Sequence, residues 1–410
     1  MPGPIVTVVT PSYNQGKYIR ATIESVLAQD YPRIEYIVMD GGSTDETAAV
    51  VKDYASRLTF ISEKDRGQSH AINKGFKMAQ GSILAWLNSD DLYLPGAVRK
   101  AVNAFKRNPG IGAVYGEGYL IDALGQNSTR FPCSEPFNLW KLVHLSDYVL
   151  QQTSYFRKDV LDDVGYLNES LDFTMDWDIF IRIGMKYPLE FIPEYMGCLR
   201  EYPEAKSSAG GARRIREIRD LLRGHTGMRI PPGYIVYGLD TYHRIWCGRI
   251  ERLCASNLKP VGNLVQSAIR LSAGLVISRT IRESQGLYSD GWAGRLLRYM
   301  LPPGDGSLLV EGVLPNLDAL YGQRIRVQAN GVELGAFDLP QGPFQIEAPL
   351  PPELHGKPVH LKIRSVRSWT PSRLALTGDR RRLAYQLKSI RWAAASCEDV
   401  DIVTPAAAAC

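Results

Sequence analysis

This sequence of 410 residues has few cysteines, no long apolar run and only a small excess of positive charge. The six cysteines are scattered, and no pair has the spacing of metal ligands or suggests a disulfide framework. Reduced thiols in a cytosol are the simplest interpretation. The formal net charge of +5 is too small to indicate a nucleic-acid partner. The sequence therefore excludes a disulfide-stapled scaffold and gives no reason to expect a protein that binds DNA or RNA.

A membrane-spanning helix is also not expected. No apolar stretch reaches the roughly 18 residues that such a helix needs, and the nearest, residues 261–281, is interrupted by Asn263, Gln266 and Arg270. The N-terminus leads directly into a strand-like run, so no signal peptide is predicted. Basic runs at residues 213–216 and 380–382 are either solvated faces or contacts with anionic lipid or substrate. The location is predicted to be cytoplasmic, with peripheral attachment to the inner face of the cell membrane left open.

The length favours two domains, because 410 residues exceed one ordinary core. Up to about residue 120 strand-like and helix-like segments alternate, with strands at residues 5–10, 34–39, 58–61 and 83–87 and helices at residues 17–29, 45–54 and 69–79. Such alternation predicts an α/β fold with a mostly parallel sheet covered by helices. Amphipathic helices follow at residues 176–186 and 213–223. Residues 1–225 are therefore assigned to the first domain.

The pattern changes in the second half of the chain. Residues 226–285 are weakly organised and helical and are interpreted as a connector. From residue 286 to 397, short alternating runs with Pro and Gly between them predict an all-β sandwich of the jelly-roll type. Asn330-Gly331 between two such runs is a hairpin signal. The tail, residues 398–410, is predicted to be disordered.

Polar clusters follow each of the first four predicted strands, at residues 11–14, 40–45, 65–68 with 73–75, and 88–91. Ligands of such sheets bind beyond the carboxyl ends of the strands. One polar cluster would be an ordinary loop, whereas four at one sheet edge describe a site. Trp86, Trp140 and Trp177 are expected to belong to the core rather than to bind sugar.

Two acidic clusters have two interpretations each. The adjacent carboxylates Asp90 and Asp91 suit a hard cation, Mg²⁺ or Mn²⁺, that bridges to substrate phosphates; alternatively, Ser89 or Asp90 caps a helix that begins near Pro95. In the segment from Asp40 to Asp45, either a carboxylate contacts a nucleobase or ribose, or Ser43 and Asp45 cap the next helix.

The stretch "VTPSYNQGKYIRATIESVLAQDYPRIEYIVMDGGSTDET", followed by "DRGQSHAINKGFKMAQGSILAWLNSDD", resembles the family-two glycosyltransferases over residues 4–225. The resemblance implies the GT-A fold and inverting transfer of a sugar from a nucleotide diphosphate to an acceptor hydroxyl, usually with a divalent metal. Uridine diphosphate is the expected nucleotide. The expected acceptor is a glycan or a lipid-linked saccharide in bacterial surface polysaccharide synthesis.

The resemblance also assigns roles to residues. The nucleotide-sugar site would be formed by Pro11, Ser12, Tyr13, Asp40, Asp45, Gly67, Gln68, Asn73, Lys74, Asn88, Ser89, Asp90, Gln152, Arg200 and Lys206. Residues 88–91 stand at the family's Asp-x-Asp motif, with Asn88 at its first position, so that Asp90 and Asp91 become the metal ligands. In "FTMDWDIFIRIG", Met175 stands where the family often has Glu, and Asp176 aligns with the catalytic base.

A base of this kind takes the proton of the attacking hydroxyl. Asp176 is therefore the predicted catalytic residue, although a carboxylate there would also stabilise a helix N-terminus electrostatically. In the last part of the chain, "YSDGW", "VQANGVELGAF" and "TGDRRRLAYQLKSI" resemble a sandwich domain attached to bacterial envelope-polysaccharide glycosyltransferases. Its role, glycan binding or a structural one, is left open, as is the oligomeric state.

Two rival functions are weighed against the transferase. Asn88 and Met175 would suit a carbohydrate-binding or scaffolding protein with a degenerate transferase domain. A nucleotidyltransferase usually has a Gly-rich basic loop near its first strand, which is absent here. Slow hydrolysis of a nucleotide sugar without acceptor would distinguish the enzyme from the binding protein.

Overall fold

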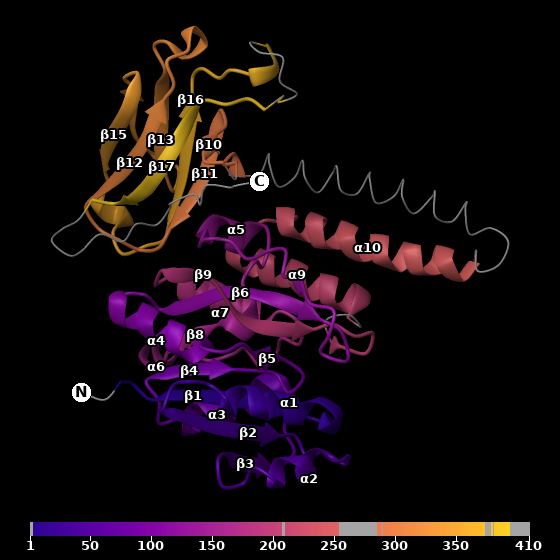
Figure 1. Cartoon of the computed structure of the whole chain (residues 1–410). Helices are drawn as coiled ribbons and strands as arrows, with labels where there is room; N and C mark the ends of the chain where they lie inside the picture. The colour runs from indigo at the N-terminus through magenta and orange to yellow at the C-terminus, as the bar shows by residue number, and fades with distance from the viewer. Residues whose placement is uncertain are drawn as a thin grey trace. The chain divides into compact units, whose positions relative to one another are not determined.

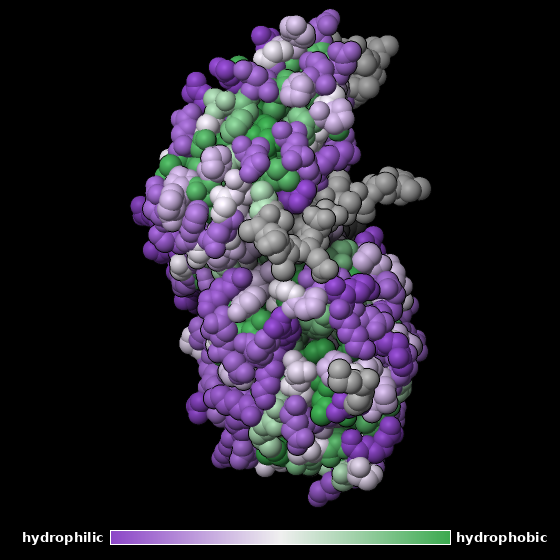
Figure 2. Space-filling model, turned by 90° about the vertical axis from the view of Figure 1, so that its left-hand side faces the viewer, coloured by the Kyte–Doolittle hydropathy of each residue, from purple (hydrophilic) through white to green (hydrophobic). Residues whose placement is uncertain are grey.

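The computed structural model describes residues 3–206, 210–253, 285–288, 290–373, 379 and 381–393 (Figure 1). The chain divides into two compact units: residues 1–135 with 147–224, and residues 136–146 with 225–410. Part of the predicted connector and the whole predicted tail lie outside the described residues. None of the described helices is long and apolar enough to cross a membrane, and the face seen in Figure 2 is mainly hydrophilic with apolar areas between.

The first half of unit one alternates as the sequence predicts. The order is β1 (Val6–Ser12), α1 (Gly16–Leu27), β2 (Ile34–Asp40), α2 (Thr47–Lys52), β3 (Thr59–Ser62), α3 (Gln68–Met78), β4 (Ile83–Trp86), β5 (Leu92–Tyr93) and α4 (Ala97–Arg107). β1 pairs in parallel with β2 and β4, and β2 pairs in parallel with β3. These strands are rich in β-branched and apolar residues, which favour a pleated, buried environment.

The second half of unit one extends this sheet with strands of mixed direction. It comprises β6 (Ala113–Ile121), β7 (Thr129–Arg130), η1 (Gln151–Thr153), β8 (Tyr155–Arg157), α6 (Lys158–Val164), α7 (Met175–Gly184), β9 (Leu189–Arg200) and most of α9 (Gly211–Thr226). The strand order is β3-β2-β1-β4-β8-β6-β9-β5, with β7 attached to β6. β8 is antiparallel to β4, whereas β6 and β9 are parallel.

Helices cover both faces of this sheet. Val8 and Val38 belong to the same buried cluster as Ile19 of α1 and Val98 of α4. On the other face, a β-carbon added to Gly75 of α3 would lie 2.6 Å from Val9, so α3 needs glycine there to approach the sheet. Trp86 and Trp177 are buried within unit one, and Trp140 within unit two, which confirms them as core residues.

Unit two contains a β-sandwich, as predicted. It also includes the helices α5 (Leu139–His144) and α10 (Pro232–Leu253). One four-stranded sheet has the order β10 (Trp292–Ala293), β17 (Tyr385–Trp392), β12 (Ser307–Leu314) and β15 (Gly342–Pro349). The other has the order β11 (Leu296–Leu301), β16 (Val359–Ser365), β13 (Arg324–Ala329) and β14 (Val332–Asp338). Their inner faces share one apolar core. Asn330 and Gly331 have φ values of 50° and 87° and form the predicted hairpin between β13 and β14.

Candidate active site

Polar residues at the ends of four parallel strands meet at one edge of the sheet in unit one. Ser12 at the end of β1 is in register with Asp40 at the end of β2, and Asp40 is in register with Ser62 at the end of β3. β4 lies on the other side of β1 and leads into residues 88–91. The convergence expected from the sequence is therefore present, because parallel strands bring their carboxyl ends to one edge.

The carboxylate of Asp40 is buried in the turn that follows β2. It accepts hydrogen bonds from the Gly42 and Ser43 amides, at 3.2 and 2.9 Å, and from the Ser43 and Ser62 hydroxyls, at 2.5 and 2.6 Å. Gly42 has φ +83°, which favours glycine. Asp40 thus fixes the shape of the turn, whatever else it contacts.

Asp45 bonds the first amides of two helices, although the N-cap residues of these helices are Gln15 and Glu46. Its Oδ1 accepts a hydrogen bond from the Thr47 amide at 3.0 Å at the start of α2, and its Oδ2 accepts one from the Gly16 amide at 2.9 Å at the start of α1. Asp45 therefore joins the N-termini of two helices.

A small cradle lies beside this turn. A β-carbon added to Gly41 would lie 2.7 Å from Asp65 Oδ2 and 3.3 Å from the Tyr13 ring, so only glycine fits without displacement. The Ser12 hydroxyl is buried and has no hydrogen-bond partner among the described residues. Tyr13 itself is 62% exposed. An exposed ring, a buried hydroxyl and a glycine wall are groups that can contact a flat nucleobase and its ribose.

The residues predicted from the segment 67–75 differ in their surroundings. Gly67 has φ +119° and precedes α3. Gln68 donates to Asn88 Oδ1 at 2.7 Å and accepts from Lys206 Nζ at 3.0 Å, so it lies within the cluster. Asn73 instead exchanges hydrogen bonds with the backbone of Leu167, and Lys74 is paired with Glu63. Gln68 is therefore brought to the same place as residues 88–91, and Asn73 is engaged elsewhere.

Asp91 is the most enclosed carboxylate of the cluster, at 1% exposure. Its Oδ2 accepts from Asn88 Nδ2 at 3.0 Å and from Gln152 Nε2 at 2.7 Å, and its Oδ1 accepts from the Arg200 amide at 2.9 Å. Burial, followed by the charge of Asp90, raises the pKa of Asp91. Three donors on two oxygens leave Asp91 little capacity to bind a metal ion directly.

Asp90 is less occupied than Asp91. Among the residues that the structure describes, its carboxylate accepts one side-chain hydrogen bond, from the Tyr202 hydroxyl at 2.7 Å. Burial raises its pKa. The alternative that Ser89 or Asp90 caps the next helix does not hold, because the N-cap of α4 is Gly96 and the side chain that accepts from its first turn is Gln29, from the Val98 amide at 3.3 Å. Asp90 is thus the carboxylate of this pair that can still accept a cation.

These residues fit a divalent cation that is shared with a substrate. Within the described ranges no group of three or more His, Cys, Asp or Glu residues is arranged to hold a metal ion. Mg²⁺ is typically bound through one or two carboxylates and completed by substrate phosphates and water. The cluster is compatible with that kind of site and not with an all-protein cage.

Arg200, at the end of β9, supports the loop that carries Asp90. Its guanidinium donates to the Asp90 carbonyl at 2.7 Å and to the Asp122 and Ala123 carbonyls at 3.1 and 3.2 Å. It also lies 5.0 Å from the centre of the Tyr18 ring. Arg200 is only 5% exposed. These contacts hold the loop, and they occupy donors of a residue that the family resemblance assigns to the nucleotide-sugar site.

Asp176 is the second residue of α7. Its Oδ1 accepts a hydrogen bond from the Trp177 amide at 2.9 Å. Burial raises the pKa of Asp176, and backbone amides, Arg214 and Lys206 act against this shift. The Ser69 hydroxyl donates to Met175 Sδ at 2.8 Å, so the start of α3, which contains Gln68, contacts the start of α7, which contains Asp176.

The sequence predicts no role for two residues of this region, Tyr202 and Glu217. Tyr202 contacts Asp90 and lies between Arg200 and Lys206, which the sequence assigned to the nucleotide-sugar site. Glu217 of α9 accepts hydrogen bonds from the segment before α7. Tyr202 lies only two residues after Arg200, so its place in the site could have been predicted from the sequence. No motif near Glu217 indicates its role.

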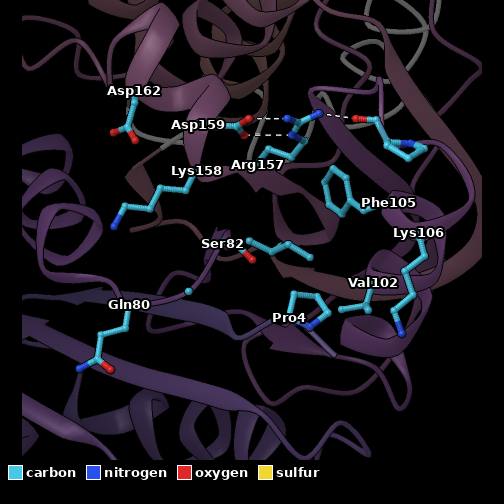
Figure 3. Close-up of a pocket in the computed structure, with 13 residues that line it drawn as sticks. Pro4, Gln80, Ser82, Val102, Phe105, Lys106, Arg157, Lys158, Asp159 and Asp162 are labelled. Atoms are coloured by element: carbon cyan, nitrogen blue, oxygen red, sulfur yellow. Dashed lines mark hydrogen bonds and ion pairs between the residues drawn. The ribbon is translucent and has the colours of Figure 1, made fainter. Parts of the chain in front are cut away.

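A separate cavity of about 600 Å³ lies at the opposite edge of the sheet, where β1 and β4 begin (Figure 3). Pro4, Val102 and Phe105 line it together with Arg157 and Lys158. Figure 3 shows the Arg157 guanidinium paired with Asp159 and donating to a backbone carbonyl, that of Pro109. Lys158 Nζ donates to the Ala79 carbonyl. The cavity is therefore remote from the convergent strand ends, and these two cations already have partners.

Comparison with known proteins identifies the class. The sequence model described as "Glycosyl transferase family 2" matches residues 7–165. An uncharacterized glycosyltransferase of Mycobacterium tuberculosis is 32% identical over 185 residues, which cover 44% of this chain and 70% of the relative. One of Rickettsia prowazekii is 28% identical over 232 residues, which cover 54% and 71%. The structure of Staphylococcus aureus TarS residues 1–349 with UDP-GlcNAc has a TM-score of 0.44, 17% identity and coverage of 69% of this chain and 93% of that chain.

Sheet order, convergent strand ends and relatives together define a glycosyltransferase with the GT-A fold. The chain belongs to glycosyl transferase family 2. It spans about a third of the length of two further relatives from Rickettsia, so the activity of those whole proteins does not transfer to it.

Proposed function

We propose that the chain transfers a sugar from a uridine diphosphate donor to a hydroxyl of a glycan or lipid-linked acceptor, with inversion and with the help of Mn²⁺ or Mg²⁺. The observation that carries the proposal is the difference between the two adjacent carboxylates. Asp91 accepts three hydrogen bonds, whereas the Asp90 carboxylate accepts one from a side chain and keeps more capacity to bind a cation. A fixed carboxylate beside an available one suits a metal that arrives with the donor.

The nucleoside would lie against Tyr13, Gly41 and the Ser12 hydroxyl. Asp40 and Asp45 shape this wall through their backbone contacts. The diphosphate would reach Asp90 and Lys206, and a cation bound there would neutralise the negative charge that develops on the leaving group. Pro11, Gly67, Ser89 and Gln152 complete the proposed donor site, together with Gln68 and Asn88.

Asp176 would act as the base. The acceptor oxygen forms a bond to the anomeric carbon, while the bond from that carbon to the diphosphate oxygen breaks and its electron pair leaves with the nucleotide. The proton of the hydroxyl passes to the Asp176 carboxylate. Attack opposite to the leaving group inverts the anomeric carbon. Arg214 and Lys206 favour the ionised form that this step requires.

The test is Asp176→Asn. The variant should bind UDP with Mn²⁺ as tightly as wild type in calorimetry, yet release UDP from a UDP-hexose at a rate reduced by at least about a hundredfold. Normal turnover by Asp176→Asn would refute the assignment of the base. A wild-type chain that binds UDP but releases none from any nucleotide sugar would favour the carbohydrate-binding alternative.

A further inference from the structure

The segment that leads into α7 is held by a carboxylate from a helix that comes later in the chain. Glu217 Oε1 accepts hydrogen bonds from the Phe173 amide at 2.7 Å, from the Thr174 amide at 2.8 Å and from the Thr174 hydroxyl at 2.9 Å. Its Oε2 accepts one from the Asp172 amide at 3.1 Å. One side chain therefore binds three consecutive amides and a hydroxyl, two to four residues before Asp176.

This arrangement replaces the usual local cap. Thr174 is the N-cap residue of α7, but its side chain caps no amide of its own helix. The hydroxyl donates to Glu217 instead, and a threonine at such a position would ordinarily accept a hydrogen bond from the helix. The start of α7 is thus fixed by α9 rather than by its own sequence.

A second side chain of α9 holds the same segment. Arg213 is paired with Asp172, and its guanidinium lies 5.8 Å from the centre of the Phe173 ring. A β-carbon added to Gly210 would lie 2.8 Å from Phe173, so the chain before α9 approaches this ring closely. α9 is itself anchored by the buried side chains of Ile215, Ile218, Leu221 and Leu222. Glu217 therefore projects from a fixed helix.

We propose that Glu217 is a positioning residue that aims the Asp176 carboxylate at the acceptor hydroxyl by fixing the entry into α7. The inference rests on the proposed function, because it takes Asp176 as the base. Glu217 acts through backbone atoms and does not itself exchange a proton with substrate. Charge-assisted hydrogen bonds are strong and directional, and a displacement of about 1 Å at a reacting group can lower the rate by about a hundredfold.

The side chain of Glu217 can be changed in two graded steps. In Glu217→Gln the amide oxygen can still accept from Phe173 and Thr174, but the amide nitrogen faces the Asp172 amide, so that two donors oppose each other. In Glu217→Ala all four hydrogen bonds are lost. Asp220→Asn is the matched control, because Asp220 is an exposed carboxylate on the same helix that pairs with Arg219.

The variants should separate rate from binding. With UDP-glucose, UDP-galactose and UDP-N-acetylglucosamine as donors and Mn²⁺ present, we expect kcat for UDP release to fall about tenfold in Glu217→Gln and about a hundredfold in Glu217→Ala. The Kd for UDP should stay within about twofold of wild type, since the proposed donor contacts are unchanged. Asp220→Asn should match wild type in both measurements.

Hydrogen exchange gives a measurement that needs no turnover. Amides of residues 172–177 should exchange faster in both Glu217 variants and at the wild-type rate in Asp220→Asn. Unchanged exchange, or wild-type kcat in folded Glu217→Gln, overturns the positioning role. A loss of UDP affinity that equals the loss of kcat also overturns it, because it would indicate general disruption. If the Asp176→Asn variant releases UDP at the wild-type rate, the proposed function is wrong. If Asp176→Asn is inactive but Glu217→Gln is fully active, only the positioning role of Glu217 is wrong.

Discussion

Tyr202 donates its phenolic hydrogen to Asp90 Oδ2 at 2.7 Å, across 112 residues of sequence. Its ring also lies 5.1 Å from that of Tyr18, which in turn lies beneath the Arg200 guanidinium. The carboxylate that is best able to bind a cation is thereby tied to the segment that follows β9. Any movement of this segment changes the environment of Asp90.

Tyr202→Phe should shift metal-dependent UDP binding to higher pH. Burial raises the pKa of Asp90, and the Tyr202 hydrogen bond lowers it, so removal of the hydroxyl raises this pKa further. A proton then competes with Mn²⁺ at higher pH than in wild type. Calorimetry at pH 6 should find weaker UDP binding in the variant, by about threefold to tenfold, with recovery near pH 8. Tyr321→Phe, at an exposed position of unit two, should leave the pH profile unchanged.

The loss of the Asp90 carboxylate should affect metal binding, and the loss of the Asp91 carboxylate should affect stability. Asp90→Asn should fold normally and lose the effect of Mn²⁺ on UDP binding. Asp91→Asn should lower the free energy of unfolding by about 1 to 3 kcal/mol, because its amide nitrogen must face one of three buried donors. Thermal unfolding would detect this as a fall of about 2 to 4 °C per kcal/mol.

Asp53→Asn controls for the loss of charge alone. Asp53 is 58% exposed and pairs with Arg20, so the change should have little effect on unfolding. Equal effects of Asp90→Asn and Asp91→Asn on Mn²⁺ dependence, with no difference in melting temperature, would contradict the division of roles.

Arg214→Gln should move the acid limb of the activity profile to higher pH. The base must be ionised, so activity is present above the pKa of Asp176 and is lost as the pH falls through it. Burial raises this pKa and Arg214 lowers it, so removal of the cation raises it further. The expected shift is upward, measured as the pH dependence of kcat for UDP release. Arg216→Gln, at an exposed position of the same helix, should show no shift.

Gly41→Ala should abolish nucleotide binding without unfolding the chain. The added β-carbon would lie 2.7 Å from Asp65 Oδ2 and 3.3 Å from Tyr13, and so would disturb the proposed nucleoside wall. Thermal stabilisation by UDP, with and without Mn²⁺, measures the loss. Gly224→Ala is the control, because no atom lies within 4 Å of the added carbon. Full stabilisation of Gly41→Ala by UDP would place the nucleoside elsewhere.

Local patterns predicted the first four strands of unit one well, but not β5 to β9, which complete its sheet. The strands predicted at residues 5–10, 34–39 and 83–87 agree within two residues with β1, β2 and β4, because β-branched and apolar runs end at the polar clusters. The Asn330-Gly331 hairpin was predictable for a similar reason, since both residues tolerate positive φ. The same logic located the convergent edge where Asp40 and Asp90 lie.

Contacts between distant segments were not predictable from one sequence. Nothing near Asp91 indicates that its third donor is the backbone amide of Arg200, because that partner lies 109 residues away. Glu217 looks like any helix-surface glutamate, since a carboxylate on an amphipathic helix usually faces water. The contacts of Asp91 and Glu217 depend on which segments the fold brings together, and the spacing of residues along the chain does not predict them.

The eleven residues from Pro136 to Ser146 determine how the chain can be divided into its two units. They belong to unit two while the chain on both sides belongs to unit one, so the polypeptide passes between units after residues 135, 146 and 224. The α5 side chains Leu139, Trp140, Leu142 and Val143 are buried, and α5 packs on β11. No single cleavage separates the two halves cleanly, and a chimera that exchanges the sandwich must carry this inserted helix with it or leave its apolar face uncovered.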